Sequence, residues 1–383
     1  MAKEQWYSVN SARLKAKRIL PRAIFDFIDG AAEDEVTAGR NEAAFQEQFL
    51  LPRMLAGHST RDKHVELFGA SLSAPVLIGP TGSSGLAWPR GEVAAAKAAH
   101  AFGTVYIVSH ASTVTLEEIA HQTNGPLWFQ SFLFRDRQIT ERLARRAARA
   151  GYQALVLTVD TQVPGQRERD IRNRFSVPLS LRPRNFWDFG SHPRWFIRMA
   201  SAGSVKAANY TDEGFGSLLK AGQRIPTLLD PTVGWDDVKW LRDLWKGPLV
   251  MKGILHPEEA AKAAEIGIDA VIVSNHGGRQ FDGVAASFDA LPAIVRAINR
   301  RIPVLLDGGI RRGADVIRAM SSGATAVLIG RPHLWGLAVA GEPGVLEILK
   351  ILDRELDRGM ALCGIGSLEN LSDAMLFHPS PQR

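Results

Sequence analysis

The sequence predicts an α/β fold, a closed (β/α)8 TIM barrel, and its pattern of apolar runs carries this prediction. Eight short runs lack the polar–apolar alternation of half-buried strands, as expected for a parallel sheet covered on both faces. These runs lie at 75–79, 104–108, 126–130, 153–158, 248–252, 270–274, 303–307 and 325–330. Amphipathic stretches separate them, for example at 91–102, 137–150, 257–266, 285–299 and 312–322. Eight successive βα units favour a closed barrel over an open doubly wound sheet, whose early Gly-x-Gly-x-x-Gly signature this sequence lacks.

Length and composition fit an ordinary globular protein. The 383 residues are 45% hydrophobic and 22% charged, which suffices for one large α/β domain or two smaller ones. The net charge of +6 favours anionic ligands but is too small to indicate nucleic-acid binding. Cys363 is the only cysteine, so a reducing compartment is expected. Because the sequence shows neither a signal peptide nor a run of roughly 18 apolar residues, we expect a cytoplasmic protein.

The residues before the first apolar run predict a helical extension. Stretches compatible with helices lie at 8–19, 22–30 and 31–48. Ser8 or Asn10 is suited to cap the first helix, and Gly30 to end the second. We expect a single domain over residues 1–383 that begins with a helical extension at 1–50.

A long insertion interrupts the βα rhythm, because about 90 residues separate the fourth and fifth runs. On the catalytic face of a barrel, such insertions are usually lids or binding loops. The stretch 181–199 interleaves arginines with aromatic residues, which suits a membrane–water interface, a lid or an oligomer contact. The stretch 200–229 is polar and Gly-rich, and 233–244 returns to helical periodicity. We expect 176–232 to form a lid or a membrane-contact insertion.

The segment Ser274–Gly283, SNHGGRQFDG, follows the sixth run at the carboxyl end, where barrels carry their chemistry. Its paired glycines permit a sharp turn close to a ligand. His276 can take and return a proton near neutral pH, and Arg279 offers a fork of donors that matches a carboxylate. These residues predict proton abstraction from a small acid. The alternative is a polar loop whose histidine and arginine are merely solvated.

The last two run ends predict a phosphate site. Asp307–Gly313 (DGGIRRG) follows the seventh run, and Gly330 with Arg331 follows the eighth. Backbone amides of a glycine turn, with Arg311 and Arg331, can cradle a dianion, while Asp307 can bond a ribityl or ribose hydroxyl. A purely structural role in tight turns would explain the glycines, but it would not explain why two arginines lie at the same edge. We expect a phosphorylated cofactor or substrate.

The remaining run ends supply further polar groups. Lys252 is a Schiff-base group, a fixed positive charge beside a reduced flavin, or a lysine that extends to solvent. Asp160 can orient a histidine, and Arg167 can serve as a second anion clamp. Close backbone approach and neutral donors, which suit a planar heterocycle with polar edges, occur at Pro80, Thr81, Gly82, Ser109 and Gln130. The sequence contains neither Cys/His metal-ligand spacing nor a Gly-x-Ser-x-Gly nucleophile motif.

In order and spacing, the motifs SNHGGRQ, DGGIRRG, IGR, TVDT and LPRAIFDFIDGAAEDE resemble those of the FMN-dependent α-hydroxy acid dehydrogenase/oxidase family. That family includes glycolate oxidase, L-lactate dehydrogenase and mandelate dehydrogenase. The resemblance runs from about residue 8 to residue 370. The stretches GPTG, NRFSVP, HPRW and WLRDLW look most similar to the bacterial membrane-associated (S)-mandelate dehydrogenases.

The resemblance implies FMN as cofactor and oxidation of a 2-hydroxy acid to the 2-oxo acid. His276 would remove the hydroxyl proton while the α-hydrogen passes to flavin N5, a carbanion route being the alternative. Asp160 would hold His276, Lys252 would stabilise the reduced flavin, and Arg279 with Arg167 would grip the carboxylate. Cofactor binding would fall to Pro80, Thr81, Gly82, Ser109, Gln130, Thr158, Lys252, Ser274, Asp307, Gly309, Arg311, Gly330 and Arg331.

Two positions depart from the family pattern. Phe27 and Phe132 stand where the family usually has tyrosines that contact the substrate. Each lost hydrogen bond to a charged or reacting group would cost roughly 1.5–3 kcal/mol. We therefore expect either a 2-hydroxy acid other than lactate, glycolate or mandelate, or a larger, amino or peptide-derived substrate. Gly82, where oxidases tend to carry alanine, favours a quinone or other carrier over O2 as electron acceptor.

The resemblance also implies a homo-oligomer, by analogy a tetramer, and peripheral contact with the inner face of the cytoplasmic membrane through 181–199. Two other classes of function stay open at this point. One is a Schiff-base aldolase or isomerase that uses Lys252 and the phosphate site. The other is a flavin- or phosphate-binding barrel without turnover.

Overall fold

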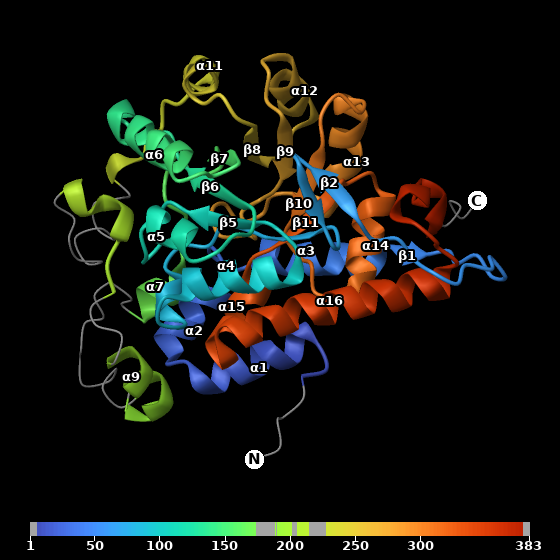
Figure 1. Cartoon of the computed structure of the whole chain (residues 1–383), viewed down its shortest axis with the longest axis horizontal. Helices are drawn as coiled ribbons and strands as arrows, with labels where there is room; N and C mark the ends of the chain where they lie inside the picture. Colours follow the sequence, from blue (N-terminus) through green and yellow to red (C-terminus); the bar gives the residue numbers. More distant parts are fainter. Residues whose placement is uncertain (1–5, 174–187, 189, 201–204, 214–226, 378–383) are drawn as a thin grey trace.

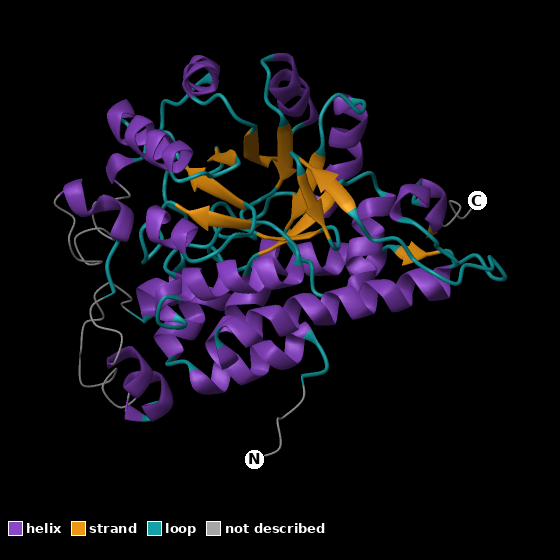
Figure 2. Ribbon diagram, viewed as in Figure 1, coloured by secondary structure: helices purple, strands orange, loops and turns teal. Residues whose placement is uncertain are grey.

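The computed structural model describes residues 6–173, 188, 190–200, 205–213 and 227–377. Eight parallel strands form a closed barrel at the centre of the molecule, as Figures 1 and 2 show, and β11 pairs with β4 to complete it. The strands are β4 Val76–Ile78, β5 Tyr106–Ser109, β6 Leu127–Ser131, β7 Ala154–Thr158, β8 Leu249–Ile254, β9 Ala270–Val273, β10 Val304–Asp307 and β11 Ala326–Ile329. They coincide with the eight apolar runs, so the predicted barrel is confirmed.

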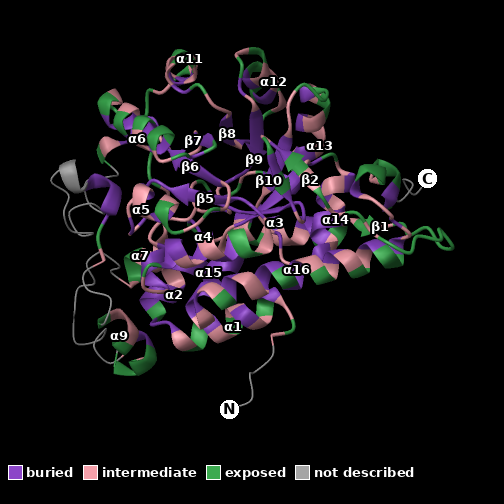
Figure 3. Ribbon diagram, viewed as in Figure 1, coloured by how far each residue is buried: buried purple, intermediate pink, exposed green. Residues whose placement is uncertain are grey.

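Apart from polar residues near their carboxyl ends, the strands are apolar, because both of their faces are covered (Figure 3). Alternate residues point inward and form a cluster inside the barrel, which includes Leu77, Ile107 and Trp128. The hairpin of β2 Val65–Leu67 and β3 Ala70–Leu72 packs onto this cluster. The ring of Phe68 in its turn lies 5.5 Å from that of Trp128, near the start of β6. The amino end of the barrel is thus closed by apolar side chains.

Helices surround the strands. They are α4 Gly91–Phe102, α5 Leu116–His121, α6 Arg137–Arg149, α11 Trp235–Leu244, α12 Pro257–Glu265, α13 Ser287–Ile298, α14 Gly313–Ser321, α15 Arg331–Ala340 and α16 Glu342–Cys363. The helix α16 was not predicted, although Val345, Ile348, Leu352 and Leu356 give it a buried stripe at helical spacing.

The helical extension consists of α1 Val9–Ile19, α2 Arg22–Asp29 and α3 Val36–Glu47. Ser8 caps α1 by accepting a hydrogen bond from the Ser11 amide at 3.2 Å, as predicted. The third helix begins at Val36 rather than at residue 31, because the left-handed Glu35 (φ 64°) interrupts the backbone there. A short antiparallel pair, β1 Phe49–Leu50 with β12 Leu376–Phe377, joins the segment after α3 to the carboxyl end of the described chain.

The insertion between β7 and β8 is described in part. It contains α7 Glu168–Arg172, α9 Pro193–Ala200 and the 3-10 helix η2 Ala208–Glu213. Trp195 is buried and donates to the Leu86 carbonyl at 2.9 Å, while Phe196 and Ile197 are 56% and 68% exposed. Residues 181–187 and much of 200–229 lie outside the described residues. None of the described helices has the length and apolar character that a membrane span requires. The single-domain organisation stays a prediction.

Candidate active site

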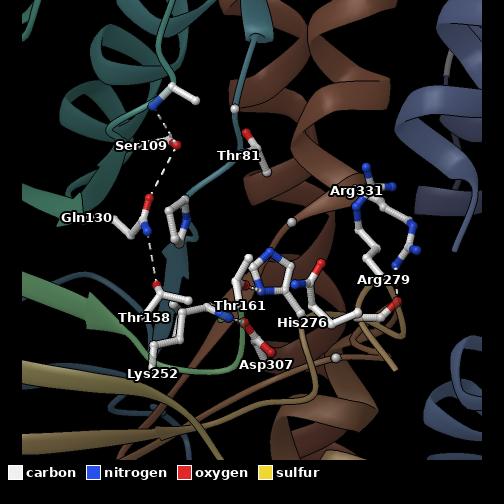
Figure 4. Close-up of a pocket in the computed structure, with 18 of the residues that line it drawn as sticks. Thr81, Ser109, Gln130, Thr158, Thr161, Lys252, His276, Arg279, Asp307 and Arg331 are labelled. Atoms are coloured by element: carbon white, nitrogen blue, oxygen red, sulfur yellow. Dashed lines mark hydrogen bonds and ion pairs between the residues drawn. The ribbon is translucent and has the colours of Figure 1, made fainter. Parts of the chain in front are cut away.

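The carboxyl ends of the barrel strands enclose a cavity of about 320 Å³, within the range of small-molecule sites. Figure 4 shows side chains from several strands converging on it. The predicted site residues that line it are Phe27, Pro80, Thr81, Gly82, Ser109, Gln130, Phe132, Thr158, Arg167, Lys252, His276, Arg279, Asp307, Gly309, Arg311, Gly330 and Arg331. Asp160 and Ser274 lie behind this lining, where they contact His276 and Lys252. Barrel closure therefore brings every predicted site residue to one place.

A row of neutral polar groups crosses three adjacent strand ends (Figure 4). Ser109 Oγ on β5 donates to Gln130 Oε1 on β6 at 3.3 Å. Gln130 Nε2 donates in turn to Thr158 Oγ1 on β7 at 3.1 Å. All three side chains are buried, so each hydrogen bond fixes the orientation of its neighbour. The row gives one wall of the cavity a fixed polar edge.

His276 is held in a strained backbone conformation at the cavity. Its φ is 58°, and Gly277 and Gly278 follow with φ of 65° and 73°. A left-handed non-glycine residue costs energy and persists only when its surroundings hold it there. The Ser274 hydroxyl accepts from the His276 amide at 3.0 Å, and the Asp160 carboxylate lies 2.8 Å from His276 Nδ1. When Nδ1 donates to Asp160, Nε2 is the basic nitrogen of the neutral ring.

The Asp160 carboxylate is kept ionised by its neighbours. Burial alone would raise its pKa, but the charge and hydrogen bond of His276 and the charge of Lys252 bring the pKa below the usual value. The Thr161 hydroxyl adds a hydrogen bond to Asp160 Oδ1 at 3.0 Å. A carboxylate at this position orients the imidazole through Nδ1 and leaves Nε2 to face a proton donor in the cavity.

Half-buried arginines give the cavity an excess of positive charge. Burial lowers the pKa of Arg279 well below its usual value, and the charges of Arg167 and Arg331 lower it further. Burial and the charge of Arg311 lower the pKa of Arg331 to about 10. Arg167 Nε is buried without a hydrogen-bond partner among the described residues. Cations that repel one another in a buried site would be stabilised by an anion bound between them.

Carbonyl groups at the end of α2 orient two of these arginines. Arg279 Nη1 donates to the carbonyls of Phe27 and Gly30 at 2.9 and 2.7 Å. Arg331 donates to the carbonyls of Asp29 and Gly30 at 3.0 and 2.8 Å. The end of a helix carries partial negative charge, so it suits these contacts. The helical extension is therefore part of the site rather than a separate appendage.

Lys252 is a buried, paired cation. Its ammonium lies 2.7 Å from Asp307 Oδ2 and donates to Ser274 Oγ at 2.6 Å. The side chain is 5% exposed, which contradicts the alternative that it extends to solvent. Asp307 Oδ1 is buried and has no hydrogen-bond partner among the described residues. Such an oxygen fits a hydroxyl group of a bound ligand.

The predicted phosphate site combines an open helix end with two arginines. Gly330 precedes α15, and a side chain added there would meet no atom within 4 Å. Arg331 begins that helix, whose amino end attracts anions. Arg311 donates to Glu42 Oε1 at 2.8 Å, so one carboxylate partly balances it. Gly309 is required also by packing, since a Cβ there would lie 2.0 Å from the Asn41 carbonyl.

Two phenylalanines present aromatic surface to the cavity. Phe27 lies under the Arg279 guanidinium, 5.5 Å from its central carbon to the ring centroid. The Phe132 ring meets the edge of His110 at a centroid distance of 4.7 Å. Both positions lack the hydroxyl that a tyrosine would direct at a substrate. This wall of the cavity is therefore less polar than the family pattern implies.

His110 is a cavity residue that the sequence analysis missed. It follows β5 directly, next to the predicted Ser109. Its position one residue beyond a strand end was the available signal. Its partner Tyr210 lies 100 residues further along the chain, in the insertion, at 2.5 Å from His110 Nδ1. A contact between such distant segments is not visible in local sequence patterns.

Comparisons with known proteins agree with this geometry. A family model described as FMN-dependent dehydrogenase matches residues 16–378. The L-lactate dehydrogenase of Caulobacter vibrioides is 41% identical over 386 aligned positions, which cover 98% of each chain. The (S)-mandelate dehydrogenase of Pseudomonas putida is 38% identical over 366, covering 96% of this chain and 92% of that protein.

A solved structure shows the same arrangement of the chain. It is that of the monotopic membrane protein (S)-mandelate dehydrogenase, with a TM-score of 0.95 and 38% identity. The match covers 98% of this chain and 100% of the other.

Proposed function

This chain belongs to the FMN-dependent dehydrogenase family, whose chemistry is oxidation of 2-hydroxy acids to 2-oxo acids, and we propose how its own residues carry that reaction. The observation that carries the proposal is the His276–Asp160 pair, 2.8 Å apart, in the cavity that the half-buried Arg167 and Arg279 also line. When bound, FMN supplies a two-electron acceptor for the hydrogen on the substrate's α-carbon.

His276 acts as the general base. Its Nε2 removes the proton of the substrate hydroxyl, and Asp160 stabilises the resulting imidazolium through Nδ1. The left-handed backbone at His276 and the bond from its amide to Ser274 hold the ring in position. Arg167 and Arg279 bind the substrate carboxylate, which would relieve their mutual repulsion.

The remaining cavity residues fit FMN. The unpartnered Asp307 Oδ1 suits a ribityl hydroxyl, and the opening at Gly330 beside Arg331 suits the phosphate. Gly309 and Arg311 make further contacts with the phosphate and the ribityl chain. Around the ring system we place Pro80, Thr81, Gly82, Ser109, Gln130, Thr158, Lys252 and Ser274. Lys252 contributes a fixed positive charge, which its pairing with Asp307 stabilises. The Schiff-base alternative, which needs a neutral amine, is not favoured by that pairing.

The substrate is a 2-hydroxy acid whose side chain lies against the aromatic wall. Phe27 and Phe132 support a substrate that is larger or less polar than lactate, glycolate or mandelate, with an amino or peptide-derived substrate as the variant. The expected electron acceptor is a quinone or other carrier, supported by Gly82. A steady-state assay with an artificial dye and a panel of 2-hydroxy acids tests this. We expect dye reduction with stoichiometric 2-oxo acid, and turnover of none of the acids would contradict it.

Peripheral membrane contact through 181–199 is a separate proposal. Its support is the pair of exposed apolar side chains on α9, Phe196 and Ile197, and the similarity to a monotopic membrane protein. Flotation with lipid vesicles should recover the chain, and the double variant Phe196→Asp, Ile197→Asp should weaken recovery. Equal recovery of both proteins would contradict the proposal. The cytoplasmic side and the homo-tetramer stay predictions.

A further inference from the structure

Both the backbone and the ring of His110 are held in place at the cavity wall. Its amide donates to the Gln130 carbonyl at 2.9 Å, and its carbonyl accepts from Asn209 Nδ2 at 3.1 Å. The ring packs edge-on against Phe132 and Phe134, with centroid distances of 4.7 and 5.7 Å. The residue as a whole is 4% exposed, and it lines the cavity. A side chain fixed this firmly presents a defined edge to a ligand.

The contact with Tyr210 decides which ring nitrogen of His110 carries the proton. Tyr210 Oη lies 2.5 Å from His110 Nδ1. A phenol is a stronger proton donor than a neutral imidazole, and an imidazole nitrogen is the better acceptor, so the hydroxyl donates to Nδ1. The ring proton then sits on Nε2. Among the described residues no acceptor for that nitrogen is found, and His110 lines the cavity.

The same surroundings keep the His110 ring neutral. Burial, and secondly the charge of His276, lowers the pKa of His110 to about 3. His110 and His276 both line the cavity, as do the two clamp arginines. His276 serves the substrate hydroxyl and the arginines serve the carboxylate. The part of a substrate left for His110 is the side chain.

We propose that His110 determines substrate specificity by donating its Nε2–H to an acceptor atom on the side chain of the 2-hydroxy acid. Tyr210 is the positioning residue, because it selects the tautomer. The inference rests on the proposed function and narrows it to acids whose otherwise apolar side chain carries an oxygen or nitrogen acceptor. Phe132 and Leu229 supply the apolar surface beside that donor. An acid without an acceptor leaves a buried donor unpaired, and this disfavours it.

Matched pairs of acids test the proposal. Suitable pairs are 4-methoxymandelate with 4-ethylmandelate, and 2-hydroxy-4-oxopentanoate with 2-hydroxy-4-methylpentanoate. In the wild type, kcat/KM for the acceptor-bearing member of at least one pair should be about tenfold higher. His110→Phe, which keeps a ring and removes the donor, should abolish that preference. The exposed control His121→Phe should retain it. An unchanged preference in His110→Phe would overturn the proposal.

Tyr210→Phe gives a second test, in which the tautomer of His110 is measured. A purely structural role of Tyr210 would leave that tautomer unchanged. The ¹⁵N spectrum of the histidine rings should show His110 as the Nε2–H tautomer in the wild type. In Tyr210→Phe it should show a mixture, and the preference between matched acids should fall. A Nδ1–H tautomer in the wild type would contradict the assignment.

Failure of this inference can be told apart from failure of the proposed function. The binding of the same acids, followed by the change in flavin absorbance, gives the preference without turnover. If acids bind with the His110-dependent preference but none is oxidised, only the proposed reaction fails. If acids are oxidised with equal preference in wild type and His110→Phe, only the specificity role fails. If no acid binds, both fail.

Discussion

The two ends of the barrel are built on opposite principles. At the amino end, the β2–β3 hairpin packs Leu67 and Leu72 onto an apolar cluster that includes Trp128. At the carboxyl end, His276 has a strained backbone, and Asp307 Oδ1 and Arg167 Nε are buried without partners among the described residues. The first end gains stability from packing, whereas the second carries backbone strain and unpartnered polar atoms that suit a bound ligand. Substitutions at the two ends should therefore separate stability from activity.

The largest expected effect is on activity alone. His276→Asn removes the base, while asparagine tolerates the left-handed backbone. We expect kcat to fall by about 10²–10⁴-fold, the usual contribution of general base catalysis. The denaturant midpoint should stay unchanged. A kcat within threefold of the wild-type value would contradict the role of His276 as the base.

A substitution at the amino end of the barrel should have the opposite effect and change stability alone. Leu72→Ala empties part of a fully buried site and should lower the free energy of unfolding by about 2–5 kcal/mol. Because the cavity lies at the other end, kcat of the folded fraction should not change. Urea titration and steady-state assays on one preparation give both quantities. A loss of kcat with no loss of stability would contradict this.

A third substitution tests the cation cluster. Arg279→Lys keeps a charge but loses Nη1, which donates to the carbonyls of Phe27 and Gly30, and with it the fork of donors that matches a carboxylate. Losing one charge-assisted hydrogen bond should raise KM for the acid about 10- to 100-fold, with a smaller change in kcat. Arg145→Lys, at an exposed ion pair with Glu141, is the matched control and should change neither. Equal KM values in all three proteins would show that Arg279 does not bind the carboxylate.

The smallest effect concerns pH. His333 contacts Thr81 at 3.1 Å, and burial lowers its pKa to about 4 from the usual 6.5. Between these values the unfolded chain takes up a proton that the folded protein excludes, so stability falls as pH falls, by roughly 1 kcal/mol per pH unit. His333→Leu should remove this part of the slope between pH 6.5 and 4. The exposed control His64→Leu should keep it, and equal slopes in all three proteins would contradict the assignment.

The sequence predicts the barrel because apolar runs and helical spacing are local patterns. It also predicts which residues stand at the strand ends, and all of these line or support the cavity. It misses α16, although the helical spacing of Val345, Ile348 and Leu352 could have been recognised in the sequence. It could not predict the His110–Tyr210 contact or the Lys252–Asp307 pair. Both depend on how distant segments meet after the barrel closes.

The most direct test of the account is an anaerobic titration of the purified protein with 2-hydroxy acids, followed by flavin absorbance. The account predicts that the protein carries FMN and that at least one acid bleaches it stoichiometrically, with release of the 2-oxo acid. Slow recovery on admission of air would identify a carrier as acceptor, and rapid recovery would identify O2. A bound flavin that none of the acids bleaches would contradict the proposed roles of His276, Arg167 and Arg279.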